Sequence, residues 1–272
     1  MKMLKTEMRN EKTTHIDRMT TEEMVSAIQA ENIVAAESIT PELSRIAAAV
    51  DAIYERMTRG GRLFYVGCGT SGRLGVVDAS ECPPTYGVPH GLVIGIIAGG
   101  DKALRTAAEG AEDSREAGLA DISAYSLTEN DSVIGISAAG GAAYVLGAFE
   151  AADAVGALKI SLTSNLNTPL EAVADLAIHP DTGAEVVTGS TRMKAGSAHK
   201  MILNMISTSV MIKLGHVYEN LMINLRPTNI KLRRRMIGII TDIMGLDATA
   251  AEALLEENGF VLRAAIDAYN NK

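Results

Sequence analysis

The sequence predicts an α/β fold: a doubly wound, mainly parallel five-stranded sheet with helices on both faces, followed by a small helical C-terminal domain. The first observation is composition, because 47% of the 272 residues are hydrophobic, with no tryptophan and three phenylalanines. A core of Ala, Val, Ile, Leu and Met is typical of helices packed on a parallel sheet. The second observation is an alternation of short, continuous apolar runs with helix-like stretches, as expected of strands that are buried on both faces.

Five short apolar runs are expected to form the strands. They are Leu63–Gly67, Leu92–Ala98, Ser132–Ser137, Leu158–Thr163 and Leu176–Ile178. Before the first run, apolar residues recur at three- and four-residue spacing from Pro41 to Gly60, which predicts an amphipathic helix. Ligands of doubly wound sheets bind beyond the carboxyl ends of the strands. The loops that follow the strands are therefore where functional residues are expected.

The chain is expected to have three parts. Residues 1–40 form an N-terminal arm and helix, and residues 41–226 form the sheet domain. Within that domain residues 189–214 are rich in Met, Ile, Leu and Ala, and their mostly apolar circumference indicates a helix that is buried against a partner subunit as well as the sheet. Residues 227–272 form a small helical domain that resembles a ubiquitin-associated bundle.

Charge and cysteine content exclude several classes of protein. The formal net charge of −8 argues against a protein that binds nucleic acid, and the basic run Lys231–Arg235 is short enough to be a solvated helix face. Cys68 and Cys82 have no Cys-x-x-Cys partner and no histidine nearby, so neither a disulfide nor a metal site is expected. No run approaches the roughly 20 apolar residues that cross a membrane. We expect a soluble cytoplasmic protein with no nucleic-acid or membrane partner.

The segment Gly67–Arg73 joins a predicted strand to a predicted helix and has the features of a phosphate-binding loop. Its glycines let the backbone approach an anion, Thr70 and Ser71 supply hydroxyl donors, and the helix start supplies N–H groups. The alternative is an ordinary turn that is capped by Ser or Thr. A dinucleotide fits less well, because the GxGxxG pattern breaks after its second glycine and the next strand does not end in an acidic residue. A compact monophosphate is the expected ligand.

Acidic residues follow this loop and the next strand. Glu81 precedes Pro83 and Pro84, which we expect to end the helix and to hold the glutamate on a rigid corner. Glu109 and Glu112 follow the second strand, near the same edge of the sheet. Two carboxylates near one phosphate site indicate acid–base chemistry. For isolated glutamates a solvated surface position is the more common explanation.

Three long segments favour the chemical explanation. They are GTSGRLGVVDASECPPTYGV at 69–88, AEGAEDSREAG at 108–118 and EVVTGSTRMKAGSAHKMILNMIST at 185–208. In content and order they resemble the signature segments of the N-acetylmuramic acid 6-phosphate etherases, a family of the sugar isomerase (SIS) superfamily. The resemblance extends over roughly residues 15–272.

This resemblance implies a reaction in the recycling of cell-wall amino sugars. The family eliminates the lactyl ether at C3 of the sugar and then adds water, which gives N-acetylglucosamine 6-phosphate and D-lactate without a metal or nucleotide cofactor. The chemistry needs a base for the C2 proton and an acid for the ether oxygen. By motif position, the resemblance makes Glu81 the proton donor to the ether oxygen and Glu112 its partner. It also implies a homodimer with pockets near the subunit interface.

The resemblance further implies which residues surround the sugar phosphate. The expected contacts are Thr70, Ser71, Gly72, Glu109, Glu185, Ser190, Thr191 and Lys194. For Ser190 and Thr191 the alternative is simple N-capping of the long helix. His199, in the same helix, is expected to be a polar residue of the helix face rather than a catalytic group.

One loop departs from the family pattern. After the third strand the family usually has Ser-Gly-Arg-Thr-Pro-Tyr, where this chain has Ala139-Gly140-Gly141-Ala142-Ala143-Tyr144. Each lost charge-assisted contact to phosphate removes on the order of 1.5–3 kcal/mol of binding free energy. A non-catalytic phosphosugar-binding regulatory protein of the same fold is therefore the alternative. An aldose–ketose isomerase is a third hypothesis, and the segments that carry Glu81 and Glu112 argue against it.

Overall fold

A computed structural model describes residues 3–225, 227 and 229–270 of the chain. The chain divides into two compact units. The first holds the residues up to Ser80 together with Gly91–Val210, and the second holds Glu81–His90 together with the residues from Met211 onward.

The first unit is built around the predicted five-stranded parallel sheet. Its strands are β1 (Leu63–Gly67), β2 (Val93–Ile97), β3 (Ser132–Ile136), β4 (Leu158–Leu162) and β5 (Leu176–Ile178). They lie in the order β2-β1-β3-β4-β5, and every neighbouring pair is parallel. Because the chain crosses from β1 to β2 on one side and then returns to β3 on the other, the strand order reverses between β1 and β3. In such sheets this switch point is where ligands bind.

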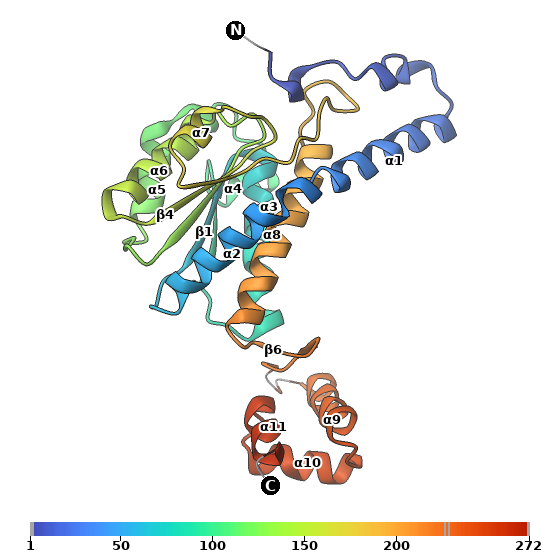
Figure 1. Ribbon diagram of the computed structural model, residues 1–272, viewed down its shortest axis with the longest axis vertical. Coiled ribbons are helices and arrows are strands. Elements are labelled where there is room, and N and C mark those ends of the chain that lie inside the picture. The colour runs from blue at the N-terminus through green and yellow to red at the C-terminus, as the bar shows by residue number, and fades with distance from the viewer. Residues whose placement is uncertain (1–2, 226, 228, 271–272) are drawn as a thin grey trace. The chain divides into compact units, whose positions relative to one another are not determined.

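Helices cover both faces of this sheet (Figure 1). The helices that begin in the first unit are α1 (Thr21–Glu37), α2 (Leu43–Met57), α3 (Gly69–Tyr86), α4 (Lys102–Arg105), α5 (Arg115–Ser123), α6 (Ala143–Val155), α7 (Pro169–Ala172) and α8 (Lys194–Lys213). On one face, Phe64 and Val66 of β1 belong to the same buried cluster as Phe149 of α6. On the other face α3 packs directly on Tyr65, because Gly75 has no side chain: a Cβ there would lie 2.7 Å from the Tyr65 Cβ. The α/β fold predicted from the apolar runs is confirmed.

The expectation that Pro83 and Pro84 end a helix is wrong. Helix α3 starts at Gly69 and continues through both prolines to Tyr86. Proline removes a helical N–H donor but keeps a φ angle that a helix accepts. The helix ends at Gly87 instead, whose φ of +67° is left-handed and whose N–H donates to the Pro83 carbonyl at 2.9 Å.

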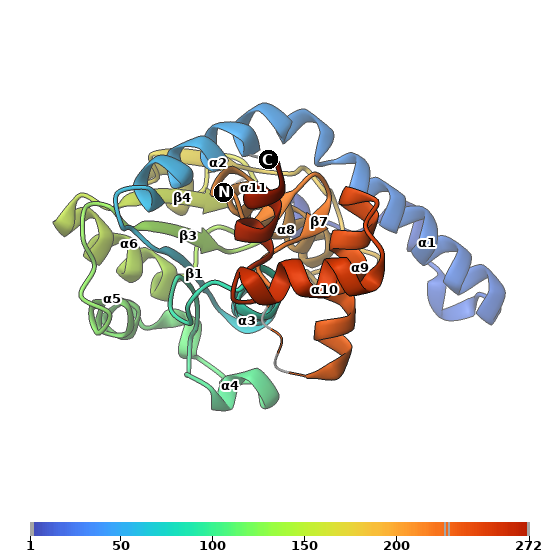
Figure 2. The same ribbon diagram turned by 90° about the horizontal axis from the view of Figure 1, so that it is seen from below.

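The N-terminal segment, predicted as an arm and helix, consists of three short 3-10 turns followed by α1. Thr20 and Glu23 form a reciprocal capping box at the start of α1. The arm is anchored within the first unit, since the Thr13 hydroxyl donates to the Val186 carbonyl at 2.8 Å. Figure 2 shows α1 continuing away from the sheet toward the edge of this unit.

The second unit contains the predicted C-terminal helices. These are α9 (Ile230–Met244), α10 (Ala248–Glu257) and α11 (Leu262–Asn270), and a short hairpin of β6 (Val217–Tyr218) and β7 (Leu221–Met222) precedes them. The helices enclose a core of their own, in which Met236, Ile240, Leu255 and Ile266 are fully buried. The predicted domain boundary falls at residue 226, which lies outside the described residues, so that boundary stays a prediction.

The basic run lies on α9. Lys231, Arg234 and Arg235 are exposed, while Arg233 pairs with Glu252 and Glu256 of α10. Over the described ranges, no helix has the length and apolarity that crossing a membrane requires. Within the same residues, no three His, Cys, Asp or Glu side chains are grouped closely enough to hold a metal ion.

Candidate functional site

A cavity of about 230 Å³ lies at the carboxyl ends of β1 and β3, where the strand order reverses. Its lining comes from the loop after β1, the loop after β3, the turn before α5 and the segment before α8. The lining residues are Cys68, Gly69, Thr70, Ser71, Glu112, Ile136, Ser137, Ala138, Ala139, Ala142 and Thr191. This position is the one at which open α/β sheets bind ligands.

The loop after β1 needs its glycines in order to bring a helix start to the cavity. A Cβ on Gly72 would lie 2.5 Å from the Gly67 carbonyl oxygen and 2.6 Å from Cγ1 of Ile97. Gly69 has a φ of +52°. The first turn of α3 therefore presses against the strand ends and lines the cavity, and the first N–H groups of a helix have no partner within it. Thr70 and Ser71 line the cavity as expected, whereas Gly72 is buried and shapes the loop.

The loop after β3 contributes backbone rather than side chains. Gly140 has a φ of +73°, and a Cβ there would lie 2.4 Å from the Thr168 Cβ, so only glycine fits. Ala142 occupies the N-cap position of α6 and has no side-chain oxygen with which to cap the helix. Among the described residues, the N–H groups of Ala143 and Tyr144 have no hydrogen-bond partner. Two helix starts, those of α3 and α6, therefore meet at the cavity.

Tyr144, the last residue of this loop, belongs to the core. Its side chain is 1% exposed and its hydroxyl donates to the carboxylate of Asp121. Burial, followed by the interaction with Asp121, raises the pKa of Tyr144 above its ordinary value. The tyrosine side chain therefore fixes α6 against α5 and does not line the cavity.

Glu112 is brought to the cavity by a 3-10 turn over Ala111–Asp113, which starts from a left-handed Gly110. Cys68 lines the same cavity. Burial and then the negative charges of Glu112 and Asp113 raise the pKa of the Cys68 thiol to about 12. The Cys68 thiol is therefore protonated near neutral pH, and a protonated thiol is a weak nucleophile. Of the two glutamates predicted to act in acid–base chemistry, Glu112 lines this cavity, and its role stays a prediction.

Two of the expected sugar contacts are not brought to the cavity. Glu185 is fully buried, and its two oxygens accept hydrogen bonds from the N–H groups of Lys194 (2.9 Å) and Ala195 (3.0 Å). The Lys194 side chain is 3% exposed and forms a buried ion pair with Glu31 of α1. These contacts fix the start of α8. Both residues therefore have a structural role here, and nothing in the geometry supports the expected contact with the sugar.

The remaining expected residues divide between the cavity and its surroundings. Thr191 lines the cavity, and Ser190 precedes it. Glu109 is exposed and does not line the cavity. Glu81 is exposed on α3 and is the first residue of the second compact unit. The roles of these residues stay predictions.

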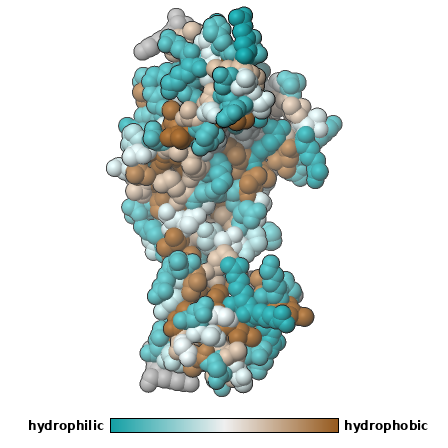
Figure 3. All heavy atoms as spheres, turned by 90° about the vertical axis from the view of Figure 1, so that its right-hand side faces the viewer, coloured by the Kyte–Doolittle hydropathy of each residue, from teal (hydrophilic) through white to brown (hydrophobic). Residues whose placement is uncertain are grey.

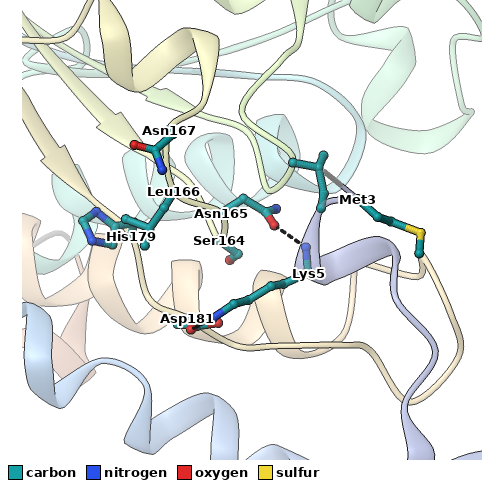
Figure 4. A pocket seen from close by; sticks show the side chains of 9 residues that line it. Met3, Lys5, Ser164, Asn165, Leu166, Asn167, His179 and Asp181 are labelled. Atoms are coloured by element: carbon teal, nitrogen blue, oxygen red, sulfur yellow. Dashed lines mark hydrogen bonds and ion pairs between the residues drawn. The ribbon is translucent and has the colours of Figure 1, made fainter. Parts of the chain in front are cut away.

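Sequence reasoning missed Asn165, which follows β4 at the same edge of the sheet. Its Nδ2 donates to the Ala138 carbonyl and to the Thr6 hydroxyl, both at 2.9 Å, and its Oδ1 accepts the Lys5 N–H at 2.9 Å. Figure 4 shows Asn165 directed at Lys5 in a second cavity, of about 280 Å³. Asn165 thus connects the N-terminal arm to a loop that lines the first cavity. Its position just after a strand was the available signal.

His199, predicted as a polar residue of the helix face, is buried in the structure. Its Nε2 lies 3.1 Å from the Ser164 hydroxyl. Burial lowers the pKa of His199 to about 4, against the smaller opposing effect of a hydrogen bond to the backbone of Thr163. The imidazole is therefore neutral at pH 7.

This buried imidazole predicts a pH dependence of stability. The unfolded chain binds a proton at His199 below a pKa of about 6.5, whereas the folded chain binds it only near 4. The stabilisation is therefore complete above about pH 6.5 and is lost as the pH falls toward 4, by roughly 3 kcal/mol at most. Urea unfolding at pH 7 and at pH 5 measures how much free energy of unfolding each protein loses between the two pH values. The His199→Gln variant is expected to lose less than the unchanged chain. Equal losses in the two proteins would contradict the prediction.

Known proteins similar to this chain fall into two groups. By sequence, residues 45–153 match the family model described as the glucokinase regulatory protein N-terminal SIS domain. The chain is 51% identical to the N-acetylmuramic acid 6-phosphate etherase of Clostridium beijerinckii, over 98% of this chain and 88% of that protein. It is also 51% identical to the protein of the same name from Caldanaerobacter subterraneus, over 96% of this chain and 85% of that one. By structure, a phosphoheptose isomerase from Francisella tularensis has a TM-score of 0.57 at 20% identity, covering 71% of this chain and 98% of its own, which shows a shared fold.

Proposed function

The chain belongs to the N-acetylmuramic acid 6-phosphate etherase family, and from this membership we propose that it cleaves the D-lactyl ether of N-acetylmuramic acid 6-phosphate, giving N-acetylglucosamine 6-phosphate and D-lactate. It is an enzyme, a carbon–oxygen lyase that acts on a phosphorylated amino sugar. The family model is named for a regulatory protein, but the relatives that match nearly the whole chain are named etherases. They give no support to the non-catalytic alternative.

The observation that carries this proposal is the cavity at the switch point of the sheet. The phosphate of the substrate binds at the start of α3, where Thr70 and Ser71 donate their hydroxyls and the first N–H groups of the helix point outward. The N–H groups of Ala143 and Tyr144 at the start of α6 supply further donors. Thr191, with Ser190 before it, forms another wall. The partial positive charges of two helix starts favour a dianionic ligand here.

The chemistry requires two proton transfers. Glu112 removes the C2 proton, which the C1 aldehyde of the open-chain sugar acidifies, and the electron pair of that bond forms the C2–C3 double bond. The C3–O bond breaks as Glu81 protonates the departing ether oxygen, and D-lactate leaves. Water then adds its hydroxyl to C3 and gives its proton to Glu81, while Glu112 returns its proton to C2, so each carboxyl group recovers its starting state. Glu109 is proposed to accept a hydrogen bond from a sugar hydroxyl at the rim.

We propose that the enzyme is a cytoplasmic homodimer. Both cysteines of the described chain are free thiols, which fits a reducing compartment. Exposed apolar side chains support a second copy: on α1, Val25 is 56% and Ile33 50% exposed. Figure 3 shows hydrophobic residues at the surface on the side where α1 lies in Figure 1. Sedimentation equilibrium at micromolar concentration is expected to give twice the chain mass.

The test of the function is release of D-lactate from N-acetylmuramic acid 6-phosphate by the unchanged chain. A protein that binds N-acetylglucosamine 6-phosphate but releases no lactate would instead be the phosphosugar-binding regulatory protein. An aldose–ketose isomerase would interconvert fructose 6-phosphate with its aldose and release no lactate. These outcomes distinguish the three hypotheses on one preparation.

The Ala139→Ser/Gly141→Arg/Ala142→Thr variant, which restores the family pattern, is expected to lower the KM for the sugar phosphate by about tenfold or more. An added side chain has room, because a Cβ on Gly141 meets no described atom within 4 Å. A threonine at position 142 would also cap α6. Gly141→Ala is the control, with an unchanged KM expected. A restored variant with an unchanged KM would mean that this loop does not limit phosphate binding.

A further inference from the structure

The first turn of α8 sets the position of Thr191, which lines the cavity. The Thr191 carbonyl accepts the N–H of Gly196 at 2.9 Å. This turn also packs closely on the start of α3, because a Cβ on Gly196 would lie 3.4 Å from Cγ2 of Thr70. A shift of the first turn of α8 would therefore move Thr191 relative to Thr70, and both residues line the cavity.

Lys194 opens this turn, and its side chain is held outside the cavity lining. The ammonium is 3% exposed and pairs with the carboxylate of Glu31. The Lys194 N–H donates to Glu185 at 2.9 Å. Because a buried charge without a partner is strongly unfavourable, the Lys194 side chain stays where Glu31 holds it.

Glu31 is a residue of α1, and its carboxylate is 2% exposed. Besides Lys194, it accepts a hydrogen bond from Nδ2 of Asn10 at 2.9 Å, and Nζ of Lys12 lies 3.2 Å from its Oε1. Nδ2 of Asn10 also donates to the Ala184 carbonyl at 3.3 Å. One buried carboxylate thus joins α1, the N-terminal arm and the start of α8, and α1 lies beside that start (Figure 1).

Glu31 is negatively charged near neutral pH although it is buried. Burial would raise the pKa of Glu31, but the hydrogen bonds from Lys194 and then Lys12 outweigh this effect and lower the pKa below its ordinary value. Lys12 is largely exposed and is stabilised by water, whereas Lys194 is buried. The charge of Glu31 therefore matters most to Lys194.

We propose that Glu31 is a positioning residue of the phosphosugar site: through Lys194 it holds the first turn of α8, and thereby the Thr191 hydroxyl, where the substrate binds. The inference rests on the proposed function and deepens it, because it gives α1 and the N-terminal arm a part in substrate affinity. Glu31 does not line the cavity, so it acts on binding rather than on proton transfer.

Glu31→Gln tests this assignment, because glutamine keeps the shape of the side chain and removes its charge. We expect calorimetric titration to show about tenfold weaker binding of N-acetylglucosamine 6-phosphate, the usual loss for one hydrogen bond to a charged group. The KM for N-acetylmuramic acid 6-phosphate is expected to rise by a similar factor. The kcat for D-lactate release should change by less than about twofold, since Glu112 is untouched. An unchanged affinity would overturn the proposal.

A double-mutant cycle with Thr191→Val separates positioning from a general loss of stability. Thr191→Val removes the hydroxyl that Glu31 places, so it is expected to weaken binding by about tenfold as well. If Glu31 acts through Thr191, adding Glu31→Gln to Thr191→Val brings little further loss. Independent effects, which would multiply to about a hundredfold, would overturn the proposal. Normal affinity in Thr191→Val alone would do the same.

Glu42→Gln is the matched control. Glu42 is another buried carboxylate of the first unit, 5% exposed, and it pairs with Arg45 and accepts the His179 N–H, each at 3.1 Å. Its unfolding midpoint in urea is expected to fall, as in Glu31→Gln, while its affinity for the sugar phosphate stays unchanged. An equal loss of affinity in both variants would mean that destabilisation alone explains the effect, and the proposal would fall.

Lys194→Met takes the place of Glu31→Gln if the glutamine variant does not fold. Glu31 then keeps Lys12 and Asn10 as partners, and methionine fills much of the same buried space. We expect the same loss of affinity, again absent when Thr191→Val is already present, and full affinity would contradict the proposal.

The titrations also separate this inference from the etherase function. If the unchanged chain binds N-acetylglucosamine 6-phosphate but releases no D-lactate, the function is rejected, while the comparison of affinities still decides the role of Glu31. If the unchanged chain does not bind the sugar phosphate, the cavity is not its site and both proposals fail.

Discussion

Glu112→Gln is expected to lower the rate of D-lactate release by about 10²–10⁴-fold, the usual contribution of a general acid or base. Glutamine keeps the shape of the side chain at the cavity but cannot take the C2 proton. The rate constant for lactate formation at saturating substrate is the measurement. The KM should change less than kcat, because the phosphate contacts of Thr70 and Ser71 are untouched.

A second measurement on the same variant does not depend on turnover. The negative charge of Glu112 contributes to the raised pKa of Cys68, so its removal is expected to bring that pKa down toward its ordinary value. The pH dependence of alkylation of the Cys68 thiol reports this shift. Glu116→Gln is the control, because Glu116 is exposed on α5 and does not line the cavity. A loss of kcat in the control as large as in Glu112→Gln would contradict the role of Glu112.

Gly72→Ala is expected to lower the free energy of unfolding by about 1–3 kcal/mol and to weaken phosphate binding at the same time. The added methyl group would meet the Gly67 carbonyl oxygen at 2.5 Å, and backbone cannot move aside as a flexible side chain does. The first turn of α3 must then shift away from β1, and its N–H groups shift with it. Urea unfolding and calorimetric titration with N-acetylglucosamine 6-phosphate measure the two effects.

The control for this variant is Gly141→Ala, because a side chain at this position makes no close contact. A Cβ at Gly141 meets no atom of the described chain within 4 Å, so neither stability nor affinity should change by much. If Gly72→Ala lost stability but kept its affinity for the sugar phosphate, the start of α3 would not be the phosphate site.

The sheet and the first loop were accessible from the sequence because their signals are local. A strand buried on both faces is a continuous apolar run, and Gly67–Arg73 carries the glycines and hydroxyls of an anion-binding turn within seven residues. The structure confirms the strands and places Thr70 and Ser71 at the cavity. The end of α3 was predicted too early because Pro83 and Pro84 lie inside the helix without ending it, and the helix stops only at the left-handed Gly87.

The errors in the candidate site have a different cause, since they concern contacts between distant segments. Glu185 caps α8 because the segment between Glu185 and the helix folds back on itself. The signature segment that contains Glu185 does not reveal this fold in its sequence. Lys194 is paired with Glu31, which is 163 positions away. The small side chains at 139–143 predicted weaker binding of phosphate. They also leave the first N–H groups of α6 without a side-chain cap, and this effect on the backbone is not evident from the missing side chains alone.

The attachment of the N-terminal arm through Asn165 has a consequence for synthesis of the protein. Lys5 and Asn165 are 160 positions apart, and Thr13 binds a carbonyl 173 positions away. At about 5–20 residues per second, a ribosome needs roughly 8–30 s to make the partner of Lys5 after Lys5 itself. The arm therefore emerges first but docks among the last parts of the first unit, and the loop at Ala138 gains its last hydrogen bonds only then. Nascent chains stopped before Asn165 are expected to leave the arm open to proteases, while the strands already made can pair.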